Sequence, residues 1–131
     1  MPSVVIVADE RVGLLTDISY ILGKEGIRME GVGIDAAGGK TVISLSVRDP
    51  QKAKEVLNKN GFEVVHKGTM VLRLPDYFKK IDEVKRTLAN EHIFLKEWKL
   101  ISGQADKGLV AIWVDKPRKA LRLLSDLVIT S

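Results

Sequence analysis

The chain has 131 residues, of which 45% are hydrophobic and 29% are charged. This balance is typical of one or two small globular domains and excludes a disordered or low-complexity chain. No uncharged apolar run reaches the roughly 18 residues that a transmembrane helix needs. Met1–Ala8 is apolar but lacks the basic region and cleavage pattern of a signal peptide. We therefore expect a soluble cytoplasmic protein.

Several kinds of chemistry have no residues to support them. Cysteine is absent, which excludes disulfides, thiolate metal sites and cysteine nucleophiles. The two histidines, His66 and His92, have no carboxylate cluster at ligand spacing. Gly31 and Gly33 lack the third glycine of a dinucleotide-binding fingerprint. The sequence thus predicts no enzyme, no catalytic residue, no metal and no cofactor.

The net charge of +4 is carried by the second half of the chain. Residues 1–67 contain 9 basic and 9 acidic residues, whereas residues 68–131 contain 12 and 8. Part of the excess follows Pro117, where Lys116, Arg118, Lys119 and Arg122 fall together. This group fits a phosphate-binding stripe, but a solvated helix face explains it better.

The first half predicts six elements in the order strand, helix, strand, strand, helix, strand. Ser3–Ala8 is a β-branched run that ends at a polar turn containing Gly13. Apolar residues from Leu14 to Leu22 recur at helical spacing, and Gly26 is placed to end that helix. Further strands are predicted over 27–36, 40–48 and 62–66, with a helix from Asp49-Pro50 to Asn60-Gly61.

The second half repeats this order. Leu15, Ile18, Leu22 and Ile27 have apolar counterparts 66 positions later, while residues of the strand 40–48 have theirs 67 positions later. We take the change of offset to mean that one residue is lost near the first turn, where Pro75-Asp76-Tyr77 replaces the region of Gly13. The chain therefore divides into two units, 1–67 and 68–131, joined around Lys67-Gly68.

Each unit is predicted to be a ferredoxin-like βαββαβ fold of the α+β class. Right-handed crossovers place both helices on one face of an antiparallel sheet and leave the other face open. A unit of about 65 residues buries only about 60% of its surface and is marginal alone. The last strand of the second unit is predicted to be stunted, because the chain ends at Ser131. Its sheet edge then needs cover, which favours a homodimer.

The opening of the chain resembles the ACT domain, a small-molecule sensing module that usually binds amino acids. The family begins with an apolar strand, an Asp-x-Pro-Gly-x-Leu turn and a helix that ends in Gly-Ile. The matching residues are Val4–Val7, Asp9-Glu10-Arg11-Val12-Gly13-Leu14-Leu15, Asp17-Ile18, Ile21-Leu22 and Gly26-Ile27. Val12 stands where the family often has proline, and the second unit matches by pattern only. The resemblance implies a tandem ACT regulatory protein with one degenerate unit, which senses a ligand and acts on a partner such as an enzyme.

The turn before the first helix is the predicted ligand site. Free N–H groups at a helix N-terminus favour a carboxylate, and Gly13 permits close approach. Arg11 offers a further carboxylate contact and Asp9 an anion for an ammonium group, although a tight turn and an N-cap explain Gly13 and Asp9 equally well. By resemblance, the strand 27–36 forms a second wall; its glycines also fit a bulge. The predicted ligand-binding residues are Asp9, Arg11, Val12, Gly13, Leu14, Gly31, Val32, Gly33 and Ile34.

Strand alternation also predicts an aromatic surface. If Ile93 and Leu95 face the helices, then Phe94 and Trp98 face the open side of the second sheet together with Trp113. The same alternation places Arg28, Glu30, Val32, Ser44 and Ser46 on the open face of the first unit. We expect the aromatic face to be an interface with a second protein sheet. Single-stranded RNA is the alternative partner, but no RNP1-like run supports it.

Overall fold

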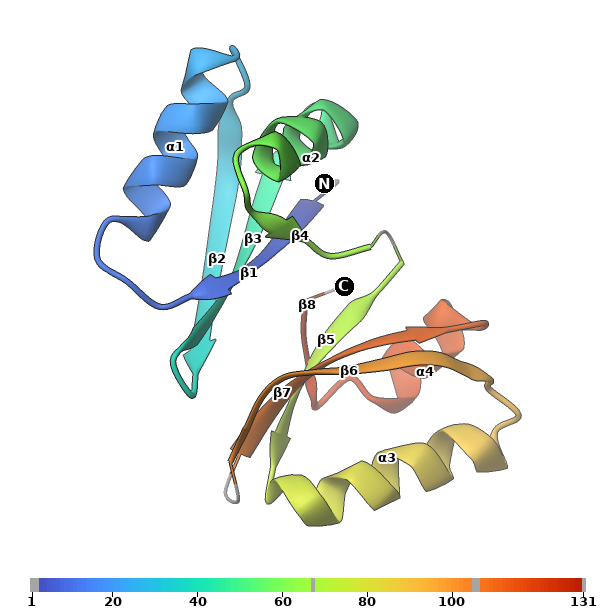
Figure 1. The fold of residues 1–131 in the computed structure, drawn as a ribbon. Coiled ribbons are helices and arrows are strands. Elements are labelled where there is room, and N and C mark those ends of the chain that lie inside the picture. Colours follow the sequence, from blue (N-terminus) through green and yellow to red (C-terminus); the bar gives the residue numbers. More distant parts are fainter. Residues whose placement is uncertain (1–2, 67, 105–106, 131) are drawn as a thin grey trace. The chain divides into compact units, whose positions relative to one another are not determined.

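The computed structural model describes residues 3–66, 68–104 and 107–130. The chain forms two compact units, Met1–Val65 and His66–Ser131 (Figure 1). Lys67, which the repeat predicts to end the first unit, lies outside the described residues. Among the described helices, none is long and apolar enough to cross a membrane.

The first unit is an antiparallel sheet with two helices on one face (Figure 1). Strand order in the sheet is β2-β3-β1-β4, so β2 lies at one edge and β1 and β3 form the centre. The elements are β1 (Ser3–Asp9), α1 (Leu14–Lys24), β2 (Met29–Ala37), β3 (Lys40–Val47), α2 (Pro50–Lys59) and β4 (Glu63–Val64).

The second unit has the same topology, with strand order β6-β7-β5-β8. Its elements are β5 (Met70–Pro75), α3 (Tyr77–Asn90), β6 (Leu95–Gln104), β7 (Lys107–Val114), α4 (Pro117–Leu123) and β8 (Val128–Thr130). The predicted α+β class with two βαββαβ units is therefore confirmed. The final strand is short in both units, and β8 pairs with β5 as β4 pairs with β1.

Each unit has its own hydrophobic core between the sheet and its helices. The stripe predicted for the first helix is buried: Ile18 and Leu22 are fully inaccessible and pack with Ile6, Ile43 and Leu45 of the central strands. The second core has the same construction, with its members drawn from matching positions. These are Leu72, Val84, Leu88, Val110 and Ile112, with Met70, Leu74, Tyr77, Ile93, Val114, Ala120 and Leu124.

The two sheets differ by one residue, and the strand registers show where it lies. The hairpin of β2 and β3 has one bulge, between Met29 and Gly31. The hairpin of β6 and β7 has the matching bulge between Leu95 and Glu97 and a second one between Leu100 and Ser102. The additional residue is thus accommodated inside β6. Our prediction that one residue is lost near the first turn is wrong.

Between the first strand and the end of the first helix, the two units have the same number of residues. The first unit has a loop where the second has an additional helical turn. Four residues separate β1 from α1, whereas only Asp76 separates β5 from α3. Helix α3 accordingly has 14 residues against 11 in α1, and its additional turn lies at the N-terminal end. Lys79 and Lys80, which align with the region of Gly13 by offset, lie inside α3. The residue of the second unit that corresponds to Gly13, as a left-handed N-cap, is Asp76.

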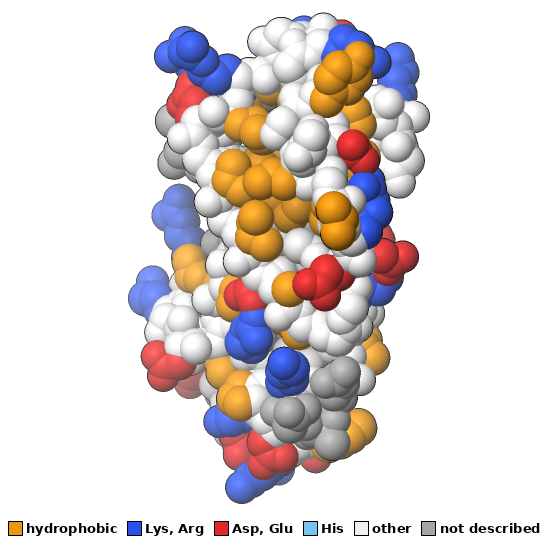
Figure 2. All heavy atoms as spheres, turned by 90° about the vertical axis from the view of Figure 1, so that its left-hand side faces the viewer, with side chains coloured by type: hydrophobic (Ala, Val, Ile, Leu, Met, Phe, Trp, Pro, Cys, Tyr) orange, Lys and Arg blue, Asp and Glu red, His pale blue; other side chains and the backbone are white. Residues whose placement is uncertain are grey.

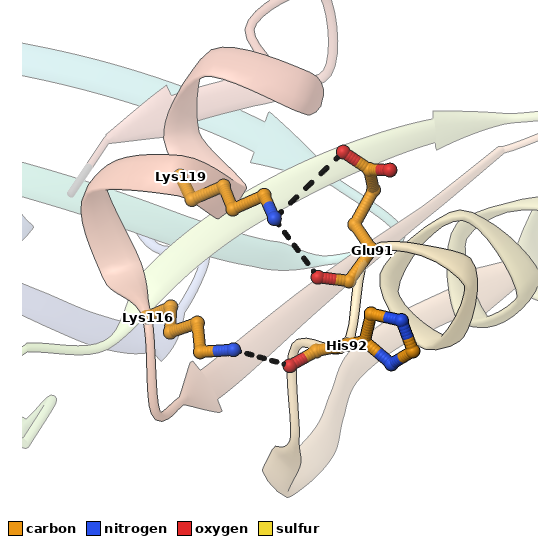
Figure 3. A network of polar contacts seen from close by, with 4 residues as sticks. All are labelled: Glu91, His92, Lys116 and Lys119. Carbon is orange, nitrogen blue, oxygen red and sulfur yellow. Dashed lines mark hydrogen bonds and ion pairs between the residues drawn. The ribbon is translucent and has the colours of Figure 1, made fainter.

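The basic group around Pro117 has a structural use. In Figure 3, Lys116 Nζ donates to the carbonyl of His92 at 2.7 Å, and Lys119 Nζ donates to the carbonyl of Glu91 at 3.0 Å. These carbonyls lie at the C-terminal end of α3, where cations are stabilised by the helix dipole. In the first unit, Lys52 Nζ donates to the carbonyl of Glu25 in the matching position, at 3.1 Å. Lys116 and Lys119 are therefore capping residues, which removes half of the proposed phosphate-binding stripe.

Candidate functional site

The turn predicted to bind a ligand is built on a glycine in the left-handed conformation. Gly13 has φ 81° and ψ 4° and is the N-cap of α1. Its carbonyl accepts a hydrogen bond from the Asp17 N–H at 2.9 Å, which starts the helix. Among the described side chains, none caps this end of α1. The first-turn N–H groups are therefore left to solvent or to a ligand.

Arg11 lies beside this helix end but already has a partner. Its Nη2 is 2.7 Å from Asp17 Oδ2, and both side chains are about half exposed. Arg11 Nη1 also approaches the carbonyl of Val12 at 3.4 Å. The side chain of Val12 is completely exposed, which is unusual for an apolar residue at a fixed turn. A ligand carboxylate would have to compete with Asp17 for the guanidinium group.

Asp9 is also paired, and not as the N-cap that we considered for it. It closes β1 opposite Lys40, and Lys40 Nζ lies 2.5 Å from Asp9 Oδ1. The hydrogen bond and charge of Lys40 lower the pKa of the Asp9 carboxyl. Asp9 thus stays ionised, but its charge is compensated within the chain. The alternation of apolar residues in β3 gives no indication of this partner, whereas the register between β1 and β3 places Lys40 opposite Asp9.

The second predicted wall is divided between the two faces of the sheet. Gly31 lies opposite Ser46 and Gly33 opposite Ser44, on the face that the helices leave open. Val32 lies opposite Leu45 and Ile34 opposite Ile43, whose side chains belong to the core under the helices. Placing Val32 on the open face was wrong, because the bulge at Glu30 shifts the alternation by one residue. Val32 and Ile34 are therefore on the same side of the sheet as α1, while the glycines are not.

In the second unit, an aromatic side chain fills the region at the start of α3, which corresponds to the turn before α1. Tyr77 begins α3 and is only 5% exposed. A Cβ added to Gly108 would lie 2.3 Å from Tyr77 Cδ1, so the ring lies directly on the glycine backbone. The position in the first unit that matches Gly108 is Thr41. The residues that precede α1 include no aromatic side chain that could pack on it. Sequence reasoning missed Tyr77, although Gly103 and Gly108 at paired positions of one hairpin were visible.

The predicted aromatic surface does not exist as one face. Trp98 lies opposite Ile112 and packs against the core on the helix side, with Lys85 Nζ of α3 4.9 Å from its ring centroid. Trp113 lies on the other face, where its ring is 4.6 Å from that of His66. Phe94 precedes β6 and is 67% exposed. Assigning Trp98 to the open face was wrong, because the bulge at Lys96 shifts the alternation, and the RNA alternative loses its main support.

The described residues contain no group of three or more histidine, aspartate and glutamate side chains that could hold a metal ion. The His66 ring contacts the Trp113 ring in a tilted arrangement, and His92 has φ 57° at the end of α3.

No protein-family model matches the chain, and no curated protein matches it in sequence. Solved structures do match. A Bacteroides thetaiotaomicron protein is 21% identical, with TM-score 0.47, covering 98% of this chain and 90% of its own. The regulatory subunit of aspartate kinase from Thermus thermophilus is 12% identical, with TM-score 0.43, covering 95% and 90%. The small subunit of acetolactate synthase from Thermotoga maritima is 11% identical, with TM-score 0.40, covering 96% and 88%.

Proposed function

We propose that this chain is a tandem ACT-domain regulatory protein that binds a small carboxylate ligand, an amino acid in the first instance, at the turn between β1 and α1. The observation that carries the proposal is Gly13, a left-handed N-cap that leaves the first turn of α1 without a side-chain cap among the described residues. The opening motif of the ACT family has its glycine at this place. The role is regulatory rather than catalytic.

The charges around the turn fit a ligand that carries both an anion and a cation. The helix end and Arg11 favour a carboxylate, and the exchange of Asp17 for a ligand carboxylate would keep the guanidinium paired. The displaced Asp17 would in turn be available to an ammonium group. Val12, fully exposed at the tip of the turn, offers an apolar contact to a ligand side chain.

Regulation would follow from linkage. A ligand that binds one state of the protein better than another shifts the population toward that state, by no more than the difference in its binding free energies. The two states would differ in assembly or in binding to a regulated partner, such as an enzyme. Because the second unit has one residue in place of this turn, ligand control is assigned to the first unit.

The test is a thermal-shift screen of the whole chain against the twenty amino acids and common small carboxylates. A ligand that binds only the folded chain stabilises it by RT ln(1 + [L]/Kd), so the melting temperature rises with the logarithm of the ligand concentration once that concentration exceeds Kd. Arg11→Met should reduce that shift, whereas Lys80→Met should not. Lys80 is the matched control because it pairs with Glu83 at 3.0 Å in the first turns of α3, and Glu83 corresponds to Asp17.

Substitution of Gly13 itself is a poorer probe. Any side chain at φ 81° is strained, so Gly13→Val would lower stability and binding together. The proposal is wrong if no compound in the screen shifts the melting temperature. It is also wrong if Arg11→Met and Lys80→Met reduce the shift equally.

A further inference from the structure

The end of α2 contains an asparagine that is followed directly by a glycine, Asn60-Gly61. The chain has two other asparagines, Asn58 and Asn90, which precede a lysine and a glutamate. An asparagine loses its side-chain amide when the backbone nitrogen of the next residue attacks its side-chain carbonyl carbon. Glycine has no Cβ to obstruct this attack, and its backbone is less restricted than that of other residues. Asn60 is therefore the asparagine of this chain at which the following residue obstructs the attack least.

In the folded chain, carbonyl groups of α2 hold both of the reacting groups. Asn60 is the C-cap of the helix, and its Nδ2 donates to the carbonyl of Val56 at 2.8 Å. The Gly61 N–H donates to the carbonyl of Asn58 at 3.1 Å. The Asn60 side chain is thus bound to the residue four positions earlier, while the nitrogen that would attack it is bound to a different carbonyl.

Further contacts at this helix end complete a Schellman motif, which fixes the arrangement. Gly61 has φ 85°, and the Phe62 N–H donates to the carbonyl of Leu57 at 3.0 Å. Phe62 packs against the core of the first unit, and Leu57 is fully buried within that core. Asn60 and Gly61 are themselves exposed, so water reaches both of them. What prevents the reaction is the pair of hydrogen bonds, and the attack requires the last turn of α2 to open.

We infer that Asn60 is a site of spontaneous deamidation, which the end of α2 protects until that end of the helix opens. In the opened state, the Gly61 nitrogen loses its proton to hydroxide and forms a bond with Asn60 Cγ. The bond from Cγ to Nδ2 breaks, and Nδ2 takes a proton from water and leaves as ammonia. Water then opens the resulting succinimide ring at either of its carbonyls, which yields aspartate or isoaspartate. Water is the co-reactant throughout, and no group is oxidised or reduced.

Either product disturbs the connection from α2 to β4. A carboxylate at position 60 lies at the negative end of the helix dipole and cannot donate to the carbonyl of Val56. Isoaspartate also adds one carbon atom to the main chain, directly before Gly61 and Phe62 of the Schellman motif. The strand that follows is short, and two residue pairs join it to β1. We therefore expect deamidation to loosen β4.

The disturbance falls on one edge of the first sheet. The strand order β2-β3-β1-β4 places β4 at the edge opposite to β2. Figure 2, viewed from the side on which α1 and β2 lie in Figure 1, shows hydrophobic side chains gathered there, and Val32 and Ile34 of β2 are 45% and 57% exposed. Deamidation should leave this surface and the turn at Gly13 unchanged. The modification of Asn60 is thus independent of ligand binding at that turn.

Peptide mass spectrometry of the whole chain tests the inference, after incubation at mildly alkaline pH with and without guanidinium chloride. Trypsin places the three asparagines on separate peptides, 55–59, 60–67 and 87–96. In the denatured chain, Asn60 should deamidate faster than Asn58 and Asn90, and enzymatic carboxyl methylation should detect isoaspartate in its peptide. In the native chain, the rate at Asn60 should be at least about tenfold lower, because two hydrogen bonds must break before the attack.

Substitution of the glycine tests the route of the reaction. Gly61→Ala should slow the deamidation of Asn60 in the denatured chain, because the new Cβ obstructs the attacking nitrogen. A side chain at φ 85° strains the folded protein, but that strain does not affect a comparison made in denaturant. The inference is overturned if this variant reacts as fast as the unchanged chain, or if no isoaspartate forms.

Two core substitutions distinguish local opening from a general loss of stability. Phe62→Ala removes the side chain that closes the end of α2, and it should raise the native rate at Asn60 several-fold. Ile93→Ala is the matched control, because the Ile93 N–H donates to the carbonyl of Leu88 at the end of α3 in the same way, at 2.9 Å. This variant should leave the rate at Asn60 unchanged.

Three further outcomes would each show that the inference is wrong. The first is a denatured chain in which Asn60 reacts no faster than Asn58. The second is a native rate at Asn60 equal to the denatured rate. The third is equal acceleration of the native rate by Phe62→Ala and Ile93→Ala.

Discussion

Two residues with positive φ show how the same backbone geometry is met by different side chains in the two units. Gly26 ends α1 at φ 72°, and His92 ends α3 at φ 57° in the matching position. In both places the next residue donates its N–H to a carbonyl five positions earlier, Ile27 to Leu22 and Ile93 to Leu88 at 2.9 Å. The end of the helix requires this left-handed backbone conformation, and glycine adopts it with less strain than histidine does.

His92→Gly should therefore stabilise the protein by about 0.5–1 kcal/mol, since relief from left-handed strain exceeds the added entropy of the unfolded chain. The reciprocal change, Gly26→His, should destabilise it by about 1 kcal/mol. Urea unfolding of both variants measures the difference. A destabilised His92→Gly protein would mean that the imidazole makes a contact that outweighs the strain.

At the scale of elements, β2 and β6 show what periodicity predicts and what it does not. The order of strands and helices, the buried stripe of α1 and the alternation of Ile43, Leu45 and Val47 follow from apolar spacing and are confirmed. The spacing of apolar residues does not reveal β-bulges, because a polar or small residue fits either face of a sheet. One extra residue at Glu30 reversed the faces assigned to Val32, and the same effect at Lys96 reversed that of Trp98.

The candidate site was predictable only in part for a related reason. The glycine turn and its position before a helix could be read from the chain, since Gly13 is followed at once by the helical pattern. The ion pairs at and beside the turn could not be predicted from the sequence. Lys40 meets Asp9 through strand register, and Asp17 meets Arg11 through a turn whose conformation no spacing specifies.

The packing of α3 against its sheet gives the second prediction. Gly108→Ala should destabilise the protein by about 1–3 kcal/mol, because the new Cβ would lie 2.3 Å from a ring that is almost completely buried. Gly23→Ala in α1, where an added Cβ meets nothing within 4 Å, should instead be stabilising. Thermal unfolding compares the two variants.

A coupling measurement identifies the cause. Tyr77→Leu alone should destabilise by removing ring contacts, but Gly108→Ala should cost less in the Tyr77→Leu background than in the native chain. If the two substitutions are additive in free energy, the loss at Gly108 comes from the backbone and not from the ring.

For the molecule as a whole, the internal repeat consists of two units with one topology and different surfaces. The first has a four-residue turn before its helix and an edge strand that pairs without a bulge from Gly31 to Ala37. In the second unit, an additional helical turn that begins at Tyr77 stands in place of this loop. Its edge strand, β6, carries charged residues and two bulges. The proposed ligand site thus belongs to the first unit, because the second unit has no such turn at the matching place.

Titration calorimetry with a ligand identified in the screen should therefore give one site per chain. The reason is geometric: neither α1 nor α3 has a side-chain cap among the described residues, but a four-residue turn precedes α1, whereas Asp76 alone separates β5 from α3. Two equivalent sites per chain would contradict this assignment, as would a stoichiometry that falls when Tyr77 is changed but not when Arg11 is changed.

The fit between Tyr77 and Gly108 also bears on how a duplicated chain folds correctly. The central strand pairs of the two units have matching registers, with Ala8 opposite Thr41 and Leu74 opposite Gly108, so a mistaken pairing of β5 with β3 during folding would be in register. That exchange brings Thr41 to the position of Gly108, where a Cβ would collide with the tyrosine ring. We therefore expect Gly108 to favour the correct partner strand, and Tyr77→Leu should slow refolding by allowing the wrong pairing to persist as a kinetic trap.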